Sequence, residues 1–155
     1  MKFSAREDVA APIEAVFAAL TDFARLERQA LRRGIEVERL DQLTAPGVGM
    51  MWRIAFDLRG RRRVADTELT VYIADQQLGF AATVSGLDCT GSVDLTSLSK
   101  TKTRMVVALN LTPQTIRARM LLQGLKLAKS GLSDRFKARI KRLARDIEDT
   151  PYQHR

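Results

Sequence analysis

The last quarter of the chain constrains its fold most strongly. Between residues 113 and 149, apolar side chains recur at steps of three, four, five and seven; they are Ile116, Met120, Leu125, Leu132, Phe136, Ile140, Leu143 and Ile147. Steps of three, four and seven keep side chains on one face of a helix, whereas the single step of five drifts from that face. The pattern therefore predicts one long amphipathic helix, which must lie against a sheet to bury its apolar stripe.

The residues before this helix alternate between apolar and polar, as strands do. A first strand is predicted over residues 2–10, and six more lie between residues 35 and 111, separated by turn residues. Between the first two strands, Ala11-Pro12 opens one short helix, and Asp22 is the expected N-cap of a second, which ends at Gly34. Strands joined by short turns favour an antiparallel meander with one covered, apolar face and one wet, polar face.

Three patterns along the chain resemble those of a known superfamily. They are a strand end at Val9 followed by Ala11-Pro12, an amphipathic helix and Asp22; the glycine turn Pro46-Gly47-Val48-Gly49 before Trp52; and the long closing helix with Ala144-Arg145-Asp146-Ile147-Glu148 at its end. In this order and spacing they resemble the START-like (SRPBCC) superfamily, which includes polyketide cyclases and the birch-pollen-allergen (Bet v 1-like) type. The resemblance covers nearly the whole chain.

The resemblance implies an α+β helix-grip fold. In this fold an antiparallel sheet of about seven strands wraps around a long C-terminal helix, and two short helices lie between strands 1 and 2. Residues 1–149 are then expected to form a single START-like domain, and residues 150–155 a flexible tail. A length of 155 residues also fits one domain with a real core.

Several features favour a cytoplasmic protein. No apolar run approaches the ~20 residues that a membrane-spanning helix needs, and the N-terminal residues lack the apolar core of a signal peptide. The single cysteine, Cys89, has no partner for an internal disulfide. The net charge of +8 permits a polyanionic partner but does not demand one.

The sequence contains no motif for catalysis, metal binding or a nucleotide cofactor. The only histidine, His154, stands near the C-terminus, which removes the usual general base and zinc ligand from the body of the domain. Cys89 falls on the apolar side of a strand, where a small buried thiol is expected. Five carboxylates of the sheet region fall on the polar side, namely Asp57, Asp66, Glu68, Asp88 and Asp94, while Glu7 shares a face with Phe3 and Val9. No catalytic residue, metal or cofactor is predicted, and enzyme activity is the less favoured interpretation.

In the resembled superfamily, an apolar cavity between the sheet and the last helix carries lipids, plant hormones or polyketides, and sometimes does chemistry on them. We therefore expect binding or carriage of a small hydrophobic or amphipathic ligand, with or without an anionic head group. The alternatives are a polyketide cyclase/aromatase-like or lyase-like enzyme that uses the same cavity, and a basic peripheral module for membranes or nucleic acid. The candidate ligand-binding residues are Trp52, Phe56, Arg63, Thr67, Leu69, Phe80, Val84, Met105, Leu121 and Leu125. Alternation also places Val71 and Ile73 beside Leu69, and core packing is the competing role for most of these side chains.

Arginines cluster at Arg59-Gly60-Arg61-Arg62-Arg63, in a turn between two predicted strands. Alternate turns of a meander fall at the same end of the sheet, so this turn should lie near residues 85–87 and the 111–115 junction. In the resembled fold that end is the mouth of the cavity, and the arginines gathered there would also include Arg32, Arg33, Arg117 and Arg119. Such a rim would bind a carboxylate or phosphate head group bidentately. The alternative is that these arginines are scattered surface charges that bind no ligand.

The closing helix is itself basic, since ten Lys and Arg against four Asp and Glu give +6 of the total +8. A basic amphipathic helix can lie on an anionic membrane or on nucleic acid. However, its apolar stripe is needed to close the core, and neither a nucleic-acid motif nor interleaved aromatic side chains accompany it. Weak contact with an anionic membrane surface is left open, and the oligomeric state is not predicted.

A continuous closing helix would also be too long for the domain. Its 36 or so residues would span ~54 Å, against an expected diameter of ~40 Å. A bend is expected at Gly124 or at Ser130-Gly131, because glycine weakens a helix. The segment 116–122 would then be the gate of the cavity, and the later segment its anchor.

Overall fold

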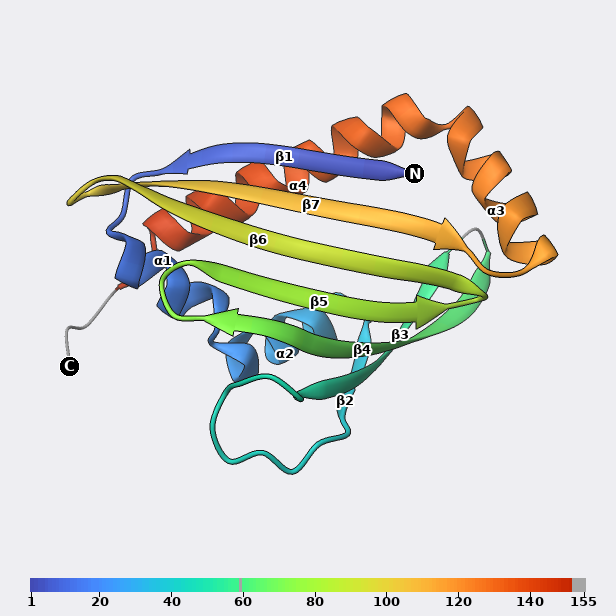
Figure 1. Ribbon diagram of the computed structural model, residues 1–155, viewed down its shortest axis with the longest axis horizontal. Helices are drawn as coiled ribbons and strands as arrows, with labels where there is room; N and C mark the ends of the chain where they lie inside the picture. The colour runs from blue at the N-terminus through green and yellow to red at the C-terminus, as the bar shows by residue number, and fades with distance from the viewer. Residues whose placement is uncertain (59, 152–155) are drawn as a thin grey trace.

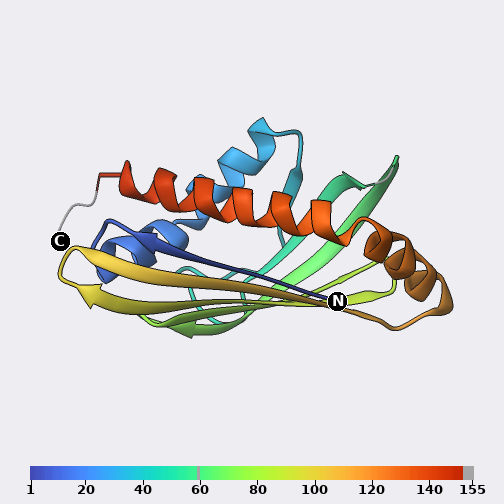
Figure 2. The ribbon, with the colours of Figure 1, turned by 90° about the horizontal axis from the view of Figure 1, so that it is seen from above.

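The computed structural model describes residues 1–58 and 60–151, and it shows a curved sheet with helices on its concave side (Figures 1 and 2). The elements in chain order are β1 (Lys2–Val9), α1 (Ile13–Leu20), α2 (Phe23–Arg32), β2 (Glu36–Arg39), β3 (Met51–Leu58), β4 (Arg61–Ile73), β5 (Gln77–Val84), β6 (Leu87–Ser99), β7 (Lys102–Pro113), α3 (Ile116–Leu127) and α4 (Lys129–Glu148). None of the helices in this described part combines the length and apolar character needed to cross a bilayer. Arg59 and His154, singled out above, lie outside the described residues.

The seven strands form one antiparallel sheet in the order β1-β7-β6-β5-β4-β3-β2 (Figure 1). Strands β2 to β7 are the predicted meander, while β1 pairs with the last strand, from Lys2 opposite Asn110 to Val9 opposite Thr103. The two short helices lie between β1 and β2, and the Asp22 carboxylate caps α2. The prediction of an α+β helix-grip fold is therefore confirmed.

A bulge in β4 corrects one prediction about the apolar face. The register of β4 against β5 shifts between Leu69 and Val71, so that Tyr72 instead of Val71 shares the face of Leu69. An extra residue in one strand inverts the alternation beyond it. Tyr72 then packs edge-on against Phe17 of α1, with ring centroids 5.3 Å apart. The placement of Val71 and Ile73 on the apolar face was wrong for this reason, and Ile73 is 44% exposed.

The predicted long C-terminal helix is two helices, so the expected bend is a complete break. Ala128 separates α3 from α4, with φ −106° and ψ 15°. The break lies between the two predicted bend positions, Gly124 and Ser130-Gly131. α4 runs across the concave side, whereas α3 turns away at one end of the sheet (Figure 2). The buried residues of the two helices belong to separate clusters, although Leu132 near the start of α4 also packs against the cluster beneath α3.

Two hydrophobic clusters hold the helices on the sheet. The main cluster lies between the concave face, α1 and α4, and it includes the fully buried side chains of Val9, Leu69 and Met105. The smaller cluster lies beneath α3, and its buried members are Leu87, Ala118, Leu122 and Leu125. The apolar side chains predicted to form one stripe on one helix therefore lie on two helices that pack in two hydrophobic clusters.

The start of α3 is seated on the turn between β5 and β6. The Gln114 N–H donates to the Gly86 carbonyl at 2.8 Å, and the Thr115 hydroxyl caps the helix by accepting from the Ala118 N–H at 3.0 Å. Gly86 has a φ of +76°, and a Cβ there would lie 2.5 Å from the Thr115 hydroxyl oxygen. Only glycine suits this contact, which fixes where α3 leaves the sheet.

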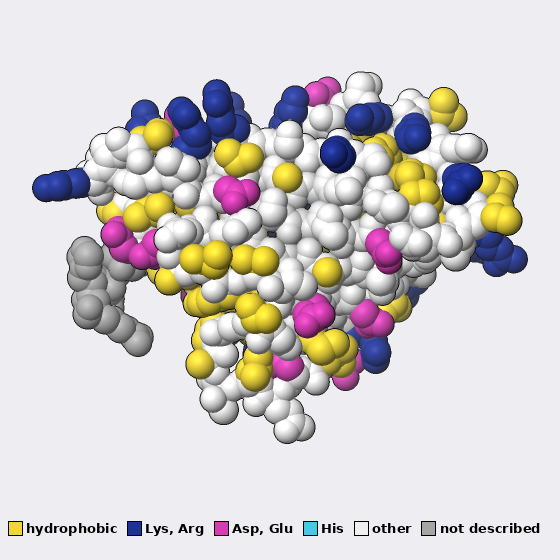
Figure 3. All heavy atoms as spheres, viewed as in Figure 1, with side chains coloured by type: hydrophobic (Ala, Val, Ile, Leu, Met, Phe, Trp, Pro, Cys, Tyr) yellow, Lys and Arg dark blue, Asp and Glu magenta, His cyan; other side chains and the backbone are white. Residues whose placement is uncertain are grey.

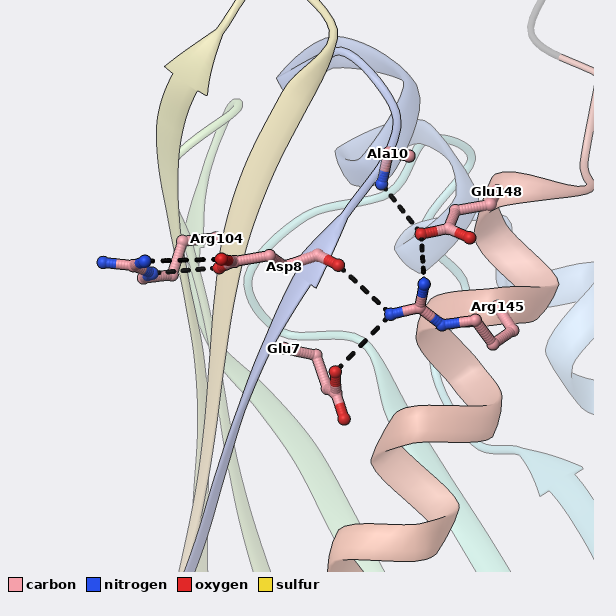
Figure 4. A network of polar contacts seen from close by, with 6 residues as sticks. All are labelled: Glu7, Asp8, Ala10, Arg104, Arg145 and Glu148. Carbon is pink, nitrogen blue, oxygen red and sulfur yellow. Dashed lines mark hydrogen bonds and ion pairs between the residues drawn. The ribbon is translucent and has the colours of Figure 1, made fainter.

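The far end of α4 is tied to β1 by polar contacts (Figure 4). The Glu148 carboxylate accepts hydrogen bonds from the Ala10 N–H at 2.9 Å and from the Arg145 guanidinium at 2.8 Å. Arg145 also donates to the Asp8 carbonyl at 3.2 Å and lies 3.5 Å from the Glu7 carboxylate. The Glu7 carboxylate, which alternation placed on the apolar face, therefore forms an ion pair with Arg145 of α4.

We expect the buried Thr103 hydroxyl to contribute to stability. Thr103 has no exposed surface, and its hydroxyl donates a hydrogen bond to the Ala11 carbonyl at 2.8 Å. Thr103→Val removes this donor, so the free energy of unfolding should fall by about 1–3 kcal/mol, as measured by urea unfolding. Thr96→Val, at an exposed position of β6, should change it by less than ~0.5 kcal/mol. Equal losses in the two variants would contradict the role assigned to this hydrogen bond.

Candidate functional site

The concave face of β3, β4 and β5 carries most of the predicted ligand-binding residues. In the register of β3 with β4, Trp52 lies opposite Thr67, and Phe56 lies opposite Arg63. Directly opposed residues of antiparallel strands share a face, so Arg63 is on the same side of the sheet as Trp52. β5 continues this side with Phe80. The face therefore changes from apolar to basic along its length.

An apolar pocket of ≈ 260 Å³ opens between α2 and this face. Its walls are Phe23, Leu26, Glu27, Ala30, Val37, Trp52, Ile54, Thr67 and Phe80. Three predicted ligand-binding residues, Trp52, Thr67 and Phe80, meet in this apolar pocket. Its volume lies below the usual range for drug-sized ligands, so it can hold one ring or part of an acyl chain.

Trp52 is held in place from three directions. Its ring lies 5.2 Å from the Phe23 ring, and the Arg39 guanidinium carbon is 5.8 Å from its ring centroid. The indole N–H donates a hydrogen bond to the Glu27 carboxylate at 2.9 Å. The sequence analysis missed Glu27, although its spacing from Phe23 and Ala30 along α2 puts it on the same side of that helix.

Asp41 fixes the loop that follows β2. Its carboxylate accepts hydrogen bonds from the Arg39 guanidinium at 2.9 Å, from the Leu43 N–H at 2.9 Å and from the Met51 N–H at 2.8 Å. The bond from Arg39, supported by the two backbone N–H groups, holds the pKa of this carboxyl well below its usual range. Asp41 thereby orients the guanidinium that lies over Trp52.

A basic groove of ≈ 630 Å³ lies at the end of the sheet where α3 begins. It is lined by Arg61, Arg63, Ser85, Gly86, Thr115, Arg117, Met120 and Leu121. The groove thus joins the β3–β4 and β5–β6 turns to α3, as the meander topology predicts, and it brings three of the rim arginines together. None of these described lining residues is acidic.

The other arginines of the predicted rim take different positions. Arg62 faces the opposite side of the sheet, where it lies 2.8 Å from the Glu36 carboxylate and 3.7 Å from that of Asp57. The pleat of β4 explains this, because residues 61 and 63 share one face and residue 62 takes the other. Three other predicted rim residues do not line the groove, namely Arg32, Arg33 and Arg119. Arg59 lies outside the described residues.

Arg63 is the least exposed arginine of the basic groove. Its Nη1 donates to the Ser85 hydroxyl at 2.8 Å, while its buried Nε has no hydrogen-bond partner among the described residues. A buried donor without a partner is uncommon, and a guanidinium presents five donors in a planar fork. The buried Nε is out of a ligand's reach, but the groove is lined by three guanidinium groups without an acidic residue beside them, so it can accept a carboxylate or phosphate.

The remaining predicted ligand-binding residues are divided between the groove and the core. Leu121 lines the basic groove. Val84 and Leu125 pack in the cluster beneath α3. Leu69 and Met105 lie in the main cluster with no exposed surface.

The cysteine and the outer-face carboxylates do not line either site. Asp66, for example, pairs with Arg53 at 3.1 Å on the outer face. Burial, together with the Asp88 charge, raises the pKa of the Cys89 thiol, which disfavours its nucleophilic form. Among residues 1–58 and 60–151, no group of three His, Cys, Asp or Glu side chains is placed to hold a metal ion.

The sequence model of one family, described as polyketide cyclase / dehydrase and lipid transport, matches residues 1–148. The chain belongs to this family. This match confirms the START-like resemblance that the sequence patterns indicated. No curated protein matches the chain.

Several solved structures have the same fold as this chain. The Zhui aromatase/cyclase from Streptomyces sp. R1128 has a TM-score of 0.69 and 16% identity, over 96% of this chain and 93% of that one. A protein from Thermus thermophilus has a TM-score of 0.66 and 16% identity, over 95% of this chain and 97% of that one. A START superfamily protein from Mycobacterium smegmatis has a TM-score of 0.60 and 15% identity, over 92% and 98%. At these identities the likeness establishes the fold, and function must be argued from the site.

We expect Asp41 to make the stability of the protein sensitive to acid. Its pKa is lower in the folded than in the unfolded protein, so its ionised form stabilises the fold above the unfolded value of about 3.9. This contribution is lost as the pH falls below that value. Asp41→Asn should therefore be less stable than the parent near neutral pH, and the difference should close in acid. This difference in the free energy of unfolding can be measured by urea unfolding at several pH values, with Trp52 emission as the signal.

Asp134→Asn, at an exposed position of α4, is the matched control for this experiment and should unfold like the parent at each pH. A difference between Asp41→Asn and the parent that stays constant down to strongly acidic pH would contradict the depressed pKa.

Proposed function

We propose that the protein binds a small amphipathic anion and carries it on the concave face of its sheet. Arg63, with Arg61 and Arg117, would hold a carboxylate or phosphate head group in the basic groove. The apolar part of the ligand would reach the apolar pocket beside Trp52. The observation that carries the proposal is the gathering of three arginines in one groove that has no acidic side chain among its described lining residues.

Charge and hydrogen bonding favour an anionic head group. Three guanidinium groups line one groove, and no carboxylate among its described lining residues neutralises them. A bound anion would accept hydrogen bonds from the guanidinium groups that line the groove and would offset the repulsion among the three cations. Ser85 and Thr115 add hydroxyl groups to the same groove, and a hydroxyl can also donate to an oxyanion.

The inner face of β4 runs from one site to the other. Thr67 lines the apolar pocket and Arg63 lines the basic groove, four residues or ~13 Å apart at the rise of a strand. Ala65 stands between them, and Ala82 lies opposite Thr67 on β5. Ala65 is only 7% exposed, so the side chains packed above it would have to move aside for an apolar chain that reaches both sites.

The family fits this proposal at the level of ligand class. Its description includes lipid transport, and a lipid is an amphipathic cargo. The same description includes polyketide cyclases, so an enzyme is the second candidate function.

Trp52 fluorescence tests the proposal, because this side chain is the only tryptophan and lines the apolar pocket. A fatty acid and the alcohol of equal chain length should both change its emission, and the acid should bind more tightly. In Arg61→Gln/Arg63→Gln, the Kd for the acid should rise at least about tenfold, which corresponds to about 1.4 kcal/mol. The Kd for the alcohol should change by less than about twofold, because the alcohol carries no charge.

Arg62→Gln is the matched control, because it removes the same charge from the same strand on the opposite face. It should leave both affinities within about twofold of the parent values. Equal losses for the acid and the alcohol in the double variant would reject head-group recognition by the groove. Binding without any change in Trp52 emission would reject the apolar pocket as the site of the tail.

A polyketide cyclase-like or lyase-like enzyme is the second candidate, and one observation favours it. Glu27 places a carboxylate in the wall of the apolar pocket, hydrogen-bonded to the Trp52 indole at 2.9 Å. A carboxylate in contact with an apolar ligand can serve as a general base. The carrier remains the better supported function, because three arginines line the basic groove with no acidic side chain among its described lining residues, whereas Glu27 is a single carboxylate.

Glu27→Gln separates the two candidates. The amide keeps an acceptor for the Trp52 N–H but cannot take up a proton from a ligand. For a carrier we expect fatty-acid affinity to stay within about twofold of the parent value. Conversion of a poly-β-ketone by the parent, reduced at least ~100-fold in Glu27→Gln with unchanged affinity, would favour the enzyme instead.

A further inference from the structure

One side of α3 is not explained by packing. Ile116, Met120 and Leu127 are 81%, 65% and 93% exposed, more than any other large apolar side chain among the described residues. All three belong to α3. Single exposed apolar residues are ordinary on protein surfaces, but the three most exposed ones share a single helix here.

These three residues form a line along α3, called here the exposed stripe. At about 100° per residue, positions 116, 120 and 127 fall within about 40° of one another around the helix axis. The buried residues Ala118, Leu122 and Leu125 occupy the opposite side. α3 is therefore apolar on two opposite sides, one packed on the protein and one facing solvent. The sequence analysis counted Ile116 and Met120 as part of a single buried stripe, which is why lipid contact was disfavoured there.

Basic side chains flank the exposed stripe on both sides. Arg117 lies to one side, and Arg119 and Lys126 lie to the other, each about 80–100° from the middle of the stripe. No Asp or Glu occurs anywhere from residue 95 to residue 133. Figure 3 shows hydrophobic and basic side chains side by side over the end of the molecule that α3 occupies.

We propose that α3 docks onto an anionic lipid surface, with the exposed stripe in the interface and the flanking basic residues at the head groups. Apolar residues on one side of a helix with Lys and Arg beside them are the features of an interfacial helix. A second copy of this chain is a poorer partner, because two such faces would bring like charges together. Nucleic acid is a poorer partner as well, since α3 has no aromatic side chain for base stacking.

The position of α3 suits this docking. The helix stands at the end of the sheet, turned away from α4, and its buried residues belong to the smaller cluster (Figures 1 and 2). Met120 belongs both to the exposed stripe and to the lining of the basic groove. A lipid surface bound to the stripe would therefore lie beside the groove, although the docking does not depend on what the groove binds.

Vesicle sedimentation with the full chain tests the proposal. The protein should bind vesicles of phosphatidylcholine with phosphatidylserine, and vesicles of phosphatidylcholine alone far less. Raising the salt from about 0.1 M to about 1 M should weaken binding, because the screening length falls from ~10 Å to ~3 Å. Ile116→Ser/Leu127→Ser should lower the partition coefficient at least about tenfold, and Arg119→Glu/Lys126→Glu should lower it by a similar factor.

Matched variants on other elements serve as controls. Val64→Ser/Ile73→Ser removes two exposed apolar side chains from β4, and Lys137→Glu/Lys141→Glu reverses two exposed charges on α4. Both should keep a partition coefficient within about threefold of the parent value. All four variants should remain folded in the absence of urea, as checked by circular dichroism, which separates a docking defect from a folding defect.

Two results would overturn the proposal. One is a parent protein that shows no preference for phosphatidylserine vesicles. The other is a dimer in sedimentation equilibrium that Ile116→Ser/Leu127→Ser dissociates, because the exposed stripe would then be a contact between copies of this chain.

Discussion

The pairing of β1 with β7 is the interaction on which the rest of the structure depends. It joins the first strand of the chain to the last and gives α4 a surface to lie on. Phe3 of β1 contacts Phe136 of α4, with ring centroids 6.0 Å apart, and the Ala10 N–H is bonded to Glu148. α4 lies on this side, whereas α2 lies near β2 and β3, where Phe23 packs against Trp52. The apolar pocket opens there, at the edge of the sheet farthest from β1.

Much of the fold could be predicted because it depends on neighbours along the chain. Alternation identified the strands, the Asp22 cap marked the start of α2, and glycine turns marked several of the ends. The same rule was enough to place Arg63 on the inner face, because residues 63 to 69 alternate without interruption before the bulge. The split between Arg61, Arg63 and the outward-facing Arg62 follows from the pleat alone.

The features that could not be predicted depend on contacts between distant parts of the chain. Tyr72 reaches the inner face because a bulge turns it toward Phe17 of α1, and no local pattern marks that bulge. The break at Ala128 arises because α3 and α4 bury their apolar sides in different clusters, whereas the glycines on either side of it remain helical. The bond between Glu27 and Trp52 joins α2 to β3, and periodicity within either element does not reveal it.

The separate cluster beneath α3 also bears on how the protein opens. α3 is bounded by the 113–115 connection and by Ala128, and its buried residues are not shared with the main cluster. Segments with their own contacts can unfold locally at a lower free energy than the whole protein. α3 can therefore detach as a cooperative unit while the sheet and α4 stay folded, and its amide hydrogens should exchange with solvent before those of β7 and α4. The protein thus has two levels of stability, and the lower one belongs to the helix that borders the basic groove.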